Sequence, residues 1–127
     1  GDYTKMAAPN IVNVTSIFGN TRGQPLTTTT TAGILTCSAN KVLKVNTIIA
    51  SNIDGVAAAS ATVSFYDSST STSYSLAHTV TVPADSSIVI IGKDSPIYLE
   101  ESDEIRGGAS SDGDLEVVVS YEEIDDA

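Results

Sequence analysis

The stretch from Val80 to Ile124 decides the fold, and it reads VTVPADSSIVIIGKDSPIYLEESDEIRGGASSDGDLEVVVSYEEI. Apolar and polar residues alternate in short runs, and acidic or glycine-rich turns separate the runs. We expect four strands here, over residues 80–82, 87–91, from 103 to about 106, and 115–121. Short alternating segments at this spacing are typical of an all-β sandwich or jelly roll.

Alternation also predicts strands in the first two thirds of the chain. The expected strands cover residues 9–18, 27–37, 41–50, 60–66 and 74–82. Residues 19–23 are predicted to form a turn or loop, and residues 67–73, rich in serine and threonine, an exposed hairpin loop. With about eight strands, the chain is predicted to be a single-domain antiparallel β-sandwich, jelly-roll-like, over residues 9–125. We expect residues 1–8 to be a flexible N-terminal segment or an upstream remnant.

The charge of the chain excludes several classes of partner. Its 127 residues carry 16 acidic and 6 basic side chains, which gives a formal net charge of −10. A nucleic-acid interface needs clustered lysine and arginine to displace counterions, and binding to an anionic membrane surface needs them too. We therefore expect no nucleic-acid partner and no membrane partner. No run approaches the roughly 18 apolar residues of a membrane span, and we expect no signal peptide.

The sequence offers few residues for catalysis. His78 is the single histidine, and its spacing from Leu76 and Val80 predicts that it faces the core or its rim. A catalytic triad needs a histidine as base, and one cysteine with one histidine cannot form a structural zinc site. Cys37 has no partner for an internal disulfide, and we expect it to be a small buried hydrophobic residue on a strand. We therefore expect no enzymatic activity, no catalytic residue and no cofactor.

Acidic residues gather in two turns. The first spans Glu100–Glu104 and the second Asp112–Asp114. Calcium needs several converging oxygen ligands, but the spacing of these residues does not match the EF-hand loop. We expect both turns to be solvated and to hold no specific metal ion. The Gly107–Gly108 pair between them is expected to end a strand where φ is positive.

The predicted strand over residues 87–91 differs from an ordinary half-buried strand. Its last four residues are all apolar: Ile88, Val89, Ile90 and Ile91. Successive side chains of a strand point to opposite faces, so two of these can face the core while the other two face away. Exposed large apolar side chains that form a patch usually mark an interface. We therefore predict a homo-oligomer that associates through these four residues, unless residues 27–31 or the N-terminal arm cover the strand within one subunit.

Several motifs resemble those of a known group of proteins. They are Met6–Val14, Lys44–Ile48 with Ser51–Gly55, Val82–Asp85, Ile97–Glu101, Asp103–Arg106 and Val118–Ile124. Together they resemble small virion structural proteins of tailed phages, especially phages that infect marine cyanobacteria. The resemblance covers most of the chain, although its motifs are turns and strands. The chain departs from the pattern at Ser102, where the resemblance implies a glycine before the aspartate.

The resemblance implies a non-enzymatic virion structural protein of the tail, neck, fibre or capsid, which acts by oligomerisation and by contacts with other virion proteins. Such a protein is assembled into the virion in the host cytoplasm. The alternative is a carbohydrate-binding or adhesive β-sandwich module with a glycan as partner. Sugar sites use exposed aromatic side chains beside polar groups, and Tyr66 is the one tyrosine predicted to point outward in mid-strand. No other feature of the sequence supports a glycan partner.

Overall fold

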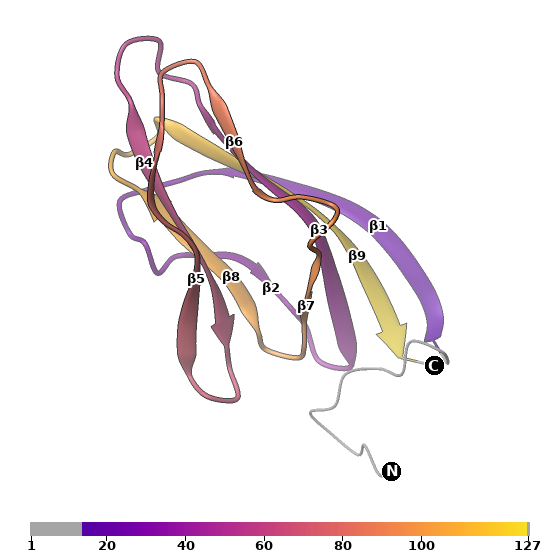
Figure 1. Ribbon diagram of the computed structural model, residues 1–127. Coiled ribbons are helices and arrows are strands. Elements are labelled where there is room, and N and C mark those ends of the chain that lie inside the picture. Colours follow the sequence, from indigo (N-terminus) through magenta and orange to yellow (C-terminus); the bar gives the residue numbers. More distant parts are fainter. Residues whose placement is uncertain (1–13, 127) are drawn as a thin grey trace.

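The described part of the chain is built from strands packed in two layers. The computed structural model describes residues 14–126, and Figure 1 shows how their elements are arranged. The nine strands of this part of the chain are β1 (Val14–Pro25), β2 (Gly33–Thr36), β3 (Lys41–Asn52), β4 (Ala59–Asp67), β5 (Thr72–Val82), β6 (Ser87–Ile91), β7 (Ile97–Leu99), β8 (Glu104–Ala109) and β9 (Leu115–Asp126). Within these residues, no helix is long and apolar enough to cross a membrane.

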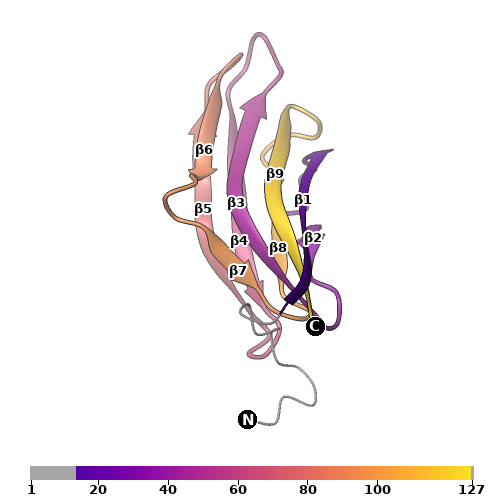
Figure 2. The same cartoon turned by 90° about the vertical axis from the view of Figure 1, so that its right-hand side faces the viewer.

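Two antiparallel sheets make up the sandwich. The first has the strand order β1-β9-β3-β6, with β7 as a fifth strand that also pairs with β3. The second has the order β2-β8-β4-β5. Figure 2 shows the two sheets lying one behind the other. The predicted fold class, an all-β antiparallel sandwich, is therefore confirmed.

The strand pairing is nested, from the first and last strands of the described residues inward. β6 and β7 lie end to end along β3, because β6 pairs with residues 48–51 and β7 with residues 43–45. They can be counted as one interrupted strand. The first strand then pairs with the last, β2 with β8, β3 with β6 and β7, and β4 with β5. A long antiparallel hairpin wrapped in this way is a jelly roll, as the sequence predicts.

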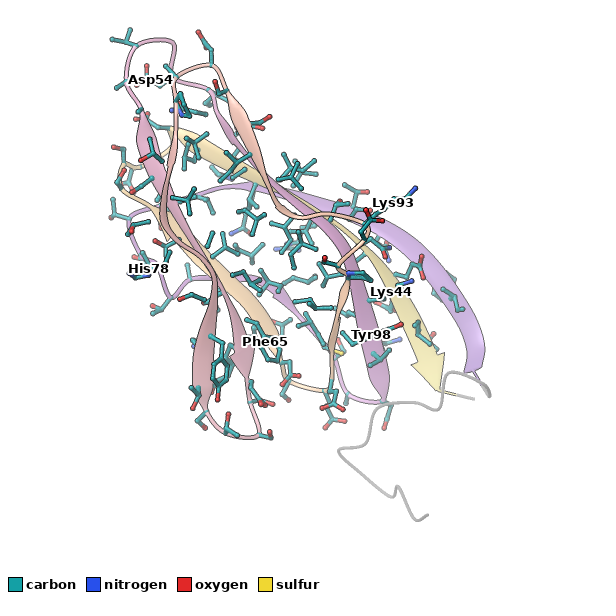
Figure 3. All side chains as sticks on the ribbon, viewed as in Figure 1. Lys44, Asp54, Phe65, His78, Lys93 and Tyr98 are labelled. Carbon is teal, nitrogen blue, oxygen red and sulfur yellow. The ribbon has the colours of Figure 1, made fainter. Side chains whose placement is uncertain are left out.

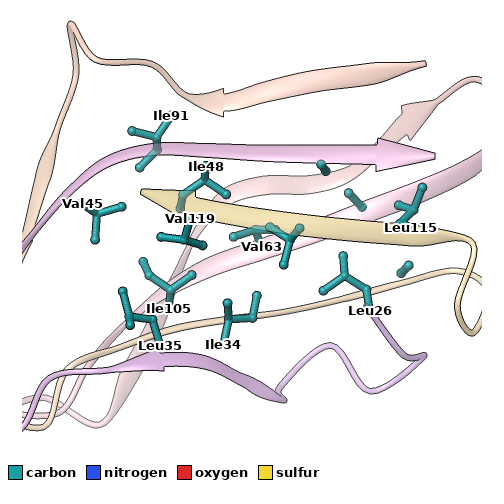
Figure 4. Close-up of a cluster of buried hydrophobic side chains, with 14 of the residues drawn as sticks. Leu26, Ile34, Leu35, Val45, Ile48, Val63, Ile91, Ile105, Leu115 and Val119 are labelled. Atoms are coloured by element: carbon teal, nitrogen blue, oxygen red, sulfur yellow. The ribbon is translucent and has the colours of Figure 1, made fainter. Parts of the chain in front are cut away.

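The core lies between the two sheets and consists mainly of aliphatic side chains. Inward and outward residues alternate along the first part of β9, where Leu115, Val117 and Val119 are fully buried. Val63 of β4 and Ile105 of β8 are equally buried and belong to the same cluster from the opposite sheet (Figure 4). Burying one such side chain stabilises the fold by roughly 1.5–3 kcal/mol. A chain without tryptophan thus obtains its core from many small, closely packed side chains.

β1 runs through the segment that the sequence predicts to be a turn. Residues 19–23 pair with β9 one by one, from Gly19 opposite Glu122 to Gly23 opposite Val118. The predicted turn is wrong because the ladder with β9 satisfies the backbone hydrogen bonds of this segment and outweighs the local preference of glycine and asparagine for turns. The predicted strand over residues 9–18 is only partly tested, since residues 9–13 lie outside the described residues.

The threonine run is a loop. Residues 27–31 are exposed, and β2 begins only at Gly33. The loop follows β8: the N–H of Ala109 donates to the Thr27 carbonyl at 2.8 Å, and the N–H of Gly107 donates to the Ala32 carbonyl at 2.9 Å. The prediction of a strand over the threonine run is wrong, because the backbone of the loop forms hydrogen bonds with β8 only at the two ends of the loop.

The close approach of this loop explains the Gly107–Gly108 pair. Both glycines lie within β8, and neither has the positive φ that the sequence suggested. A Cβ atom on Gly108 would lie 2.7 Å from the carbonyl oxygens of Thr27 and Thr29. A Cβ atom on Gly107 would lie 2.7 Å from the carbonyl oxygen of Thr62. The pair is needed because neighbouring backbone passes too close for a side chain.

A bulge in β5 changes the expected direction of His78. Val80 lies opposite Ala61, but the next paired residue is Ala77 opposite Val63, so β5 carries one more residue than β4 at this point. Thr79, inside the bulge, has a φ of 48°. His78 is exposed, so of the two predicted positions, facing the core or at its rim, the first is wrong.

We expect Gly108→Ala to lower the free energy of unfolding by about 1–3 kcal/mol, because the added methyl group would overlap two carbonyl oxygens. Gly19→Ala is the matched control, since no atom lies within 4 Å of its Cβ position. Urea unfolding followed by circular dichroism gives both free energies. Equal stability of the two variants would contradict the close approach of the loop to β8.

Candidate interaction surface

The predicted interface residues lie on β6, at the edge of the five-stranded sheet. Ile91 pairs with Ile48 and Val89 pairs with Ile49, so Ile90 is an additional residue, and the strand has a bulge there. Ile91 is buried, whereas Ile88 and Ile90 are half-buried and pack against the core.

Val89 alone of the predicted interface residues is largely exposed, at 66%. The expectation that two of the four side chains face away from the core is thus corrected to one. The bulge, which breaks strict alternation, is the reason. The interface itself stays a prediction, centred on Val89.

One of the two segments that could cover β6 within a subunit lies elsewhere. Residues 27–31 follow β8 in the opposite sheet, so they leave β6 uncovered. The N-terminal arm, the other segment, lies outside the described residues. Among residues 14–126, Val89 therefore remains at an open sheet edge.

An apolar cleft lies beside this edge, between β5 of one sheet and β7 of the other. Its volume is about 170 Å³, and its lining residues are Phe65, Tyr74, Leu76, Ile97 and Tyr98. Tyr74 and Tyr98 are each about half exposed, at 53% and 47%. Sequence reasoning missed the cleft because β7 has only three residues and was not recognised as a strand, although the aromatic side chains on either side were a signal.

Tyr66, which the sequence predicts to point outward as the aromatic side chain of a sugar site, is covered by an arginine. The guanidinium carbon of Arg106 lies 3.6 Å from the centre of its ring. Arg106 is held in place by a salt bridge in which its Nε lies 3.0 Å from Oε1 of Glu104. Tyr66 does point outward as predicted, but its face is occupied by a cation–π contact and is not open to a ligand.

The first acidic turn is tied into the structure through a buried carboxylate. Asp103 is only 4% exposed. Its Oδ1 accepts hydrogen bonds from the N–H and hydroxyl of Ser68 at 3.0 and 3.1 Å, and its Oδ2 accepts one from the N–H of Glu100 at 3.0 Å. The expectation that this turn is solvated is wrong for Asp103, because the carboxylate joins the β4–β5 connection to the β7–β8 turn.

Two further acidic side chains of these turns accept hydrogen bonds from backbone N–H groups. The Asp112 carboxylate accepts a hydrogen bond from the N–H of Thr28 at 2.9 Å, and that of Glu101 accepts one from the N–H of Asn40 at 3.3 Å. Among the described residues, no group of three or more histidine, cysteine, aspartate or glutamate side chains is placed to hold a metal ion. The acidic turns therefore act as connectors between loops.

Ser102 adopts the backbone conformation that favours glycine. Its φ is 71°, and its N–H donates to the Cys37 carbonyl at 2.9 Å. Left-handed backbone costs a residue with a Cβ atom roughly 1–2 kcal/mol, and glycine avoids this cost. The turn geometry is thus one in which the glycine implied by the resemblance would fit without strain.

Cys37 and His78 lie too far apart in the fold to act together. Cys37 follows β2 and His78 belongs to β5, which are the two opposite edges of the same sheet. Cys37 is buried, as predicted, although it comes just after the strand. Its Sγ donates to the Lys41 carbonyl at 3.2 Å, and burial raises the pKa of the thiol to about 11. The thiol is therefore protonated at neutral pH.

No family model, curated protein or solved structure matches this chain. Its function must be inferred from the surface just described: an open edge at Val89 and an aromatic cleft farther along that edge. Neither feature brings together a nucleophile, a base and a polar pocket.

We expect Asp103→Ala to lower the free energy of unfolding by about 2–3 kcal/mol, because it leaves the N–H groups of Ser68 and Glu100 without their acceptors. Asp112→Ala is the control, since the hydrogen bond it removes is exposed to solvent. Urea unfolding curves measure the free energy of unfolding of both variants. If Asp103→Ala lowers it no more than Asp112→Ala does, the hydrogen bonds of the Asp103 carboxylate do not stabilise the fold.

We expect the Cys37 thiol to react with a thiolate-specific disulfide reagent about a hundredfold more slowly in the folded protein than in urea at pH 8, because its pKa is raised by burial. The protonated thiol stabilises the fold below pH 9, and this stability is lost as the pH rises towards 11. Absorbance of the released reagent follows the reaction. Equal rates with and without urea would contradict the burial of the thiol.

Proposed function

We propose that this chain is a non-enzymatic structural protein of a phage particle, in the tail, neck, fibre or capsid, which acts by forming oligomers and by contacting other virion proteins. The observation that carries the proposal is the open sheet edge, where Val89 is exposed and, farther along β3, an apolar cleft lies beside β7. A surface of this kind favours association with other protein chains. Jelly rolls also occur in viral capsid domains, which supports the proposal by analogy of fold.

The charge distribution supports an assembly of protein with protein. The formal net charge is −10, and two of the basic residues that the structure describes, Lys41 and Arg106, form salt bridges with carboxylates. A surface with so few cations favours neither nucleic acid nor an anionic lipid. Its acidity keeps the subunits soluble until specific contacts join them.

The carbohydrate-binding alternative is supported less well. It depends on an aromatic ring that lies open beside polar groups. Tyr66, the residue on which that alternative rests, has its ring under the Arg106 guanidinium. The structural role is therefore the function that the surface supports best.

We expect Val89→Glu to remain folded and to form smaller assemblies than the wild type, because the new charge would have to be buried on association. Ile91→Glu, by contrast, should unfold the domain, since Ile91 is only 5% exposed. Val118→Glu is the matched control, because Val118 is also an exposed valine but lies on an inner strand of the same sheet. Light scattering measures the mass, and circular dichroism checks the fold. A wild type that stays monomeric at high micromolar concentration would refute association through this edge.

The role in a virion is tested on the particle itself. We expect electron cryo-microscopy of purified phage particles that encode this chain to show jelly-roll density of this size at repeated positions. Mass spectrometry of the same particles should detect the chain in stoichiometric amounts. Absence of the chain from purified particles would rule out the virion role, whatever its oligomeric state.

A further inference from the structure

The connection between β3 and β4 presents an apolar tip to solvent. Val56 is 92% exposed, more than any other large apolar side chain in the described part of the chain. Ile53, at the start of the same connection, is 56% exposed. Loops between strands are usually polar. Two exposed β-branched side chains in one loop therefore indicate a site that binds another molecule.

The loop is held in a fixed shape by a buried asparagine. The side chain of Asn52 accepts a hydrogen bond from the N–H of Asp54 at 2.8 Å and donates to the carbonyls of Ala57 and Val82, each at 3.0 Å. The Asp54 carboxylate in turn accepts one from the N–H of Val56 at 2.9 Å. The loop is therefore ordered before any partner arrives, which lowers the entropic cost of binding.

The cleft between β5 and β7 has the size and chemistry to receive such a tip. An apolar cavity of about 150 Å³ can hold one benzene molecule, and the cleft measures about 170 Å³. One branched aliphatic side chain fits this space. Figure 3 shows Asp54, in the loop, at one end of the sandwich and Phe65 and Tyr98, in the cleft, towards the other end. The loop of one molecule is thus placed to reach the cleft of another.

The charges around the tip and the cleft are complementary. Lys44 is the cross-strand partner of Tyr98 and lies next to it (Figure 3). Lys44 forms no salt bridge with any residue that the structure describes. At the tip, the Asp54 carboxylate bonds to the N–H of Val56, and Oδ2 of Asp85 lies 3.6 Å from the Cβ position of Gly55, so two carboxylates lie close to Val56. A tip with two nearby carboxylates is attracted to a cleft that has a lysine at its rim.

We infer that the β3–β4 loop of one copy docks into the cleft between β5 and β7 of a second copy, with Val56 filling the cleft. The two surfaces differ, so the contact is heterologous and joins copies head to tail into a ring or a filament. This contact is separate from the one proposed at Val89, and it stands whether or not the assembly belongs to a virion.

The test mixes two variants that are each defective in one half of the contact. Both carry Val89→Glu, so that the β6 edge contributes nothing. The first adds Val56→Asp in the loop, and the second adds Tyr74→Glu in the cleft. We expect each variant alone to associate at least about tenfold more weakly than Val89→Glu itself. Mixed in equal amounts, they should form a dimer of one copy each, because one intact loop then meets one intact cleft.

Sedimentation velocity measures the masses, and circular dichroism confirms that every variant is folded. Val118→Asp in the same background is the control and should assemble as fully as Val89→Glu. If Tyr74→Glu fails to fold, Tyr98→Ser replaces it as the cleft variant. Lys44→Glu should weaken association without abolishing it, because the apolar contact remains.

Three results would overturn the inference. One is that Val89→Glu stays monomeric up to near-millimolar concentration, which would leave the proposed function intact. The second is that Val56→Asp assembles as well as its parent, or that the mixture forms no dimer. The third is binding to a glycan array that Tyr74→Glu loses and Val56→Asp keeps, since the cleft would then be a sugar site.

Discussion

The double pairing of β9 is the constraint on which the rest of the structure depends. This strand lies between β1 and β3, so the first and the last strand of the described residues pair in one sheet. Its buried face, Leu115, Val117 and Val119, can point inward in only one register. A slip by one residue would turn all three outward and expose the core. The nested order of the other strands follows once the first and last strands are paired.

Much of the fold can be predicted from the alternation of apolar and polar residues. Where that prediction is wrong, the physical cause can be identified. The strands over residues 41–50, 60–66 and 115–121 were predictable because each has a clear apolar face. The errors at residues 19–23 and 27–31 arise where a distant partner decides the backbone: β9 extends the first segment, and β8 holds the second as a loop. Local sequence carries no sign of either partner.

The candidate surface was predictable only in part, for a related reason. An unbroken apolar run on β6 correctly marked an unusual strand, but the bulge at Ile90 decided which side chains are exposed. The aromatic cleft depends on two strands, β5 and β7, from opposite sheets, and nothing in either segment alone indicates their proximity. Exposure of a tyrosine is likewise set by its neighbours, since Arg106 covers Tyr66 while Tyr98 stays open.

The break between β6 and β7 has a consequence for the behaviour of the protein at high concentration. A long, straight strand at the edge of a sheet can recruit strands from other molecules without limit, as in amyloid. Here the edge along β3 is divided into segments of five and three residues by a connection that contains Gly92 and Pro96. Neither segment is long enough to template an extended backbone ladder. At this edge, crowded copies therefore meet through side chains and not through a continuous backbone ladder.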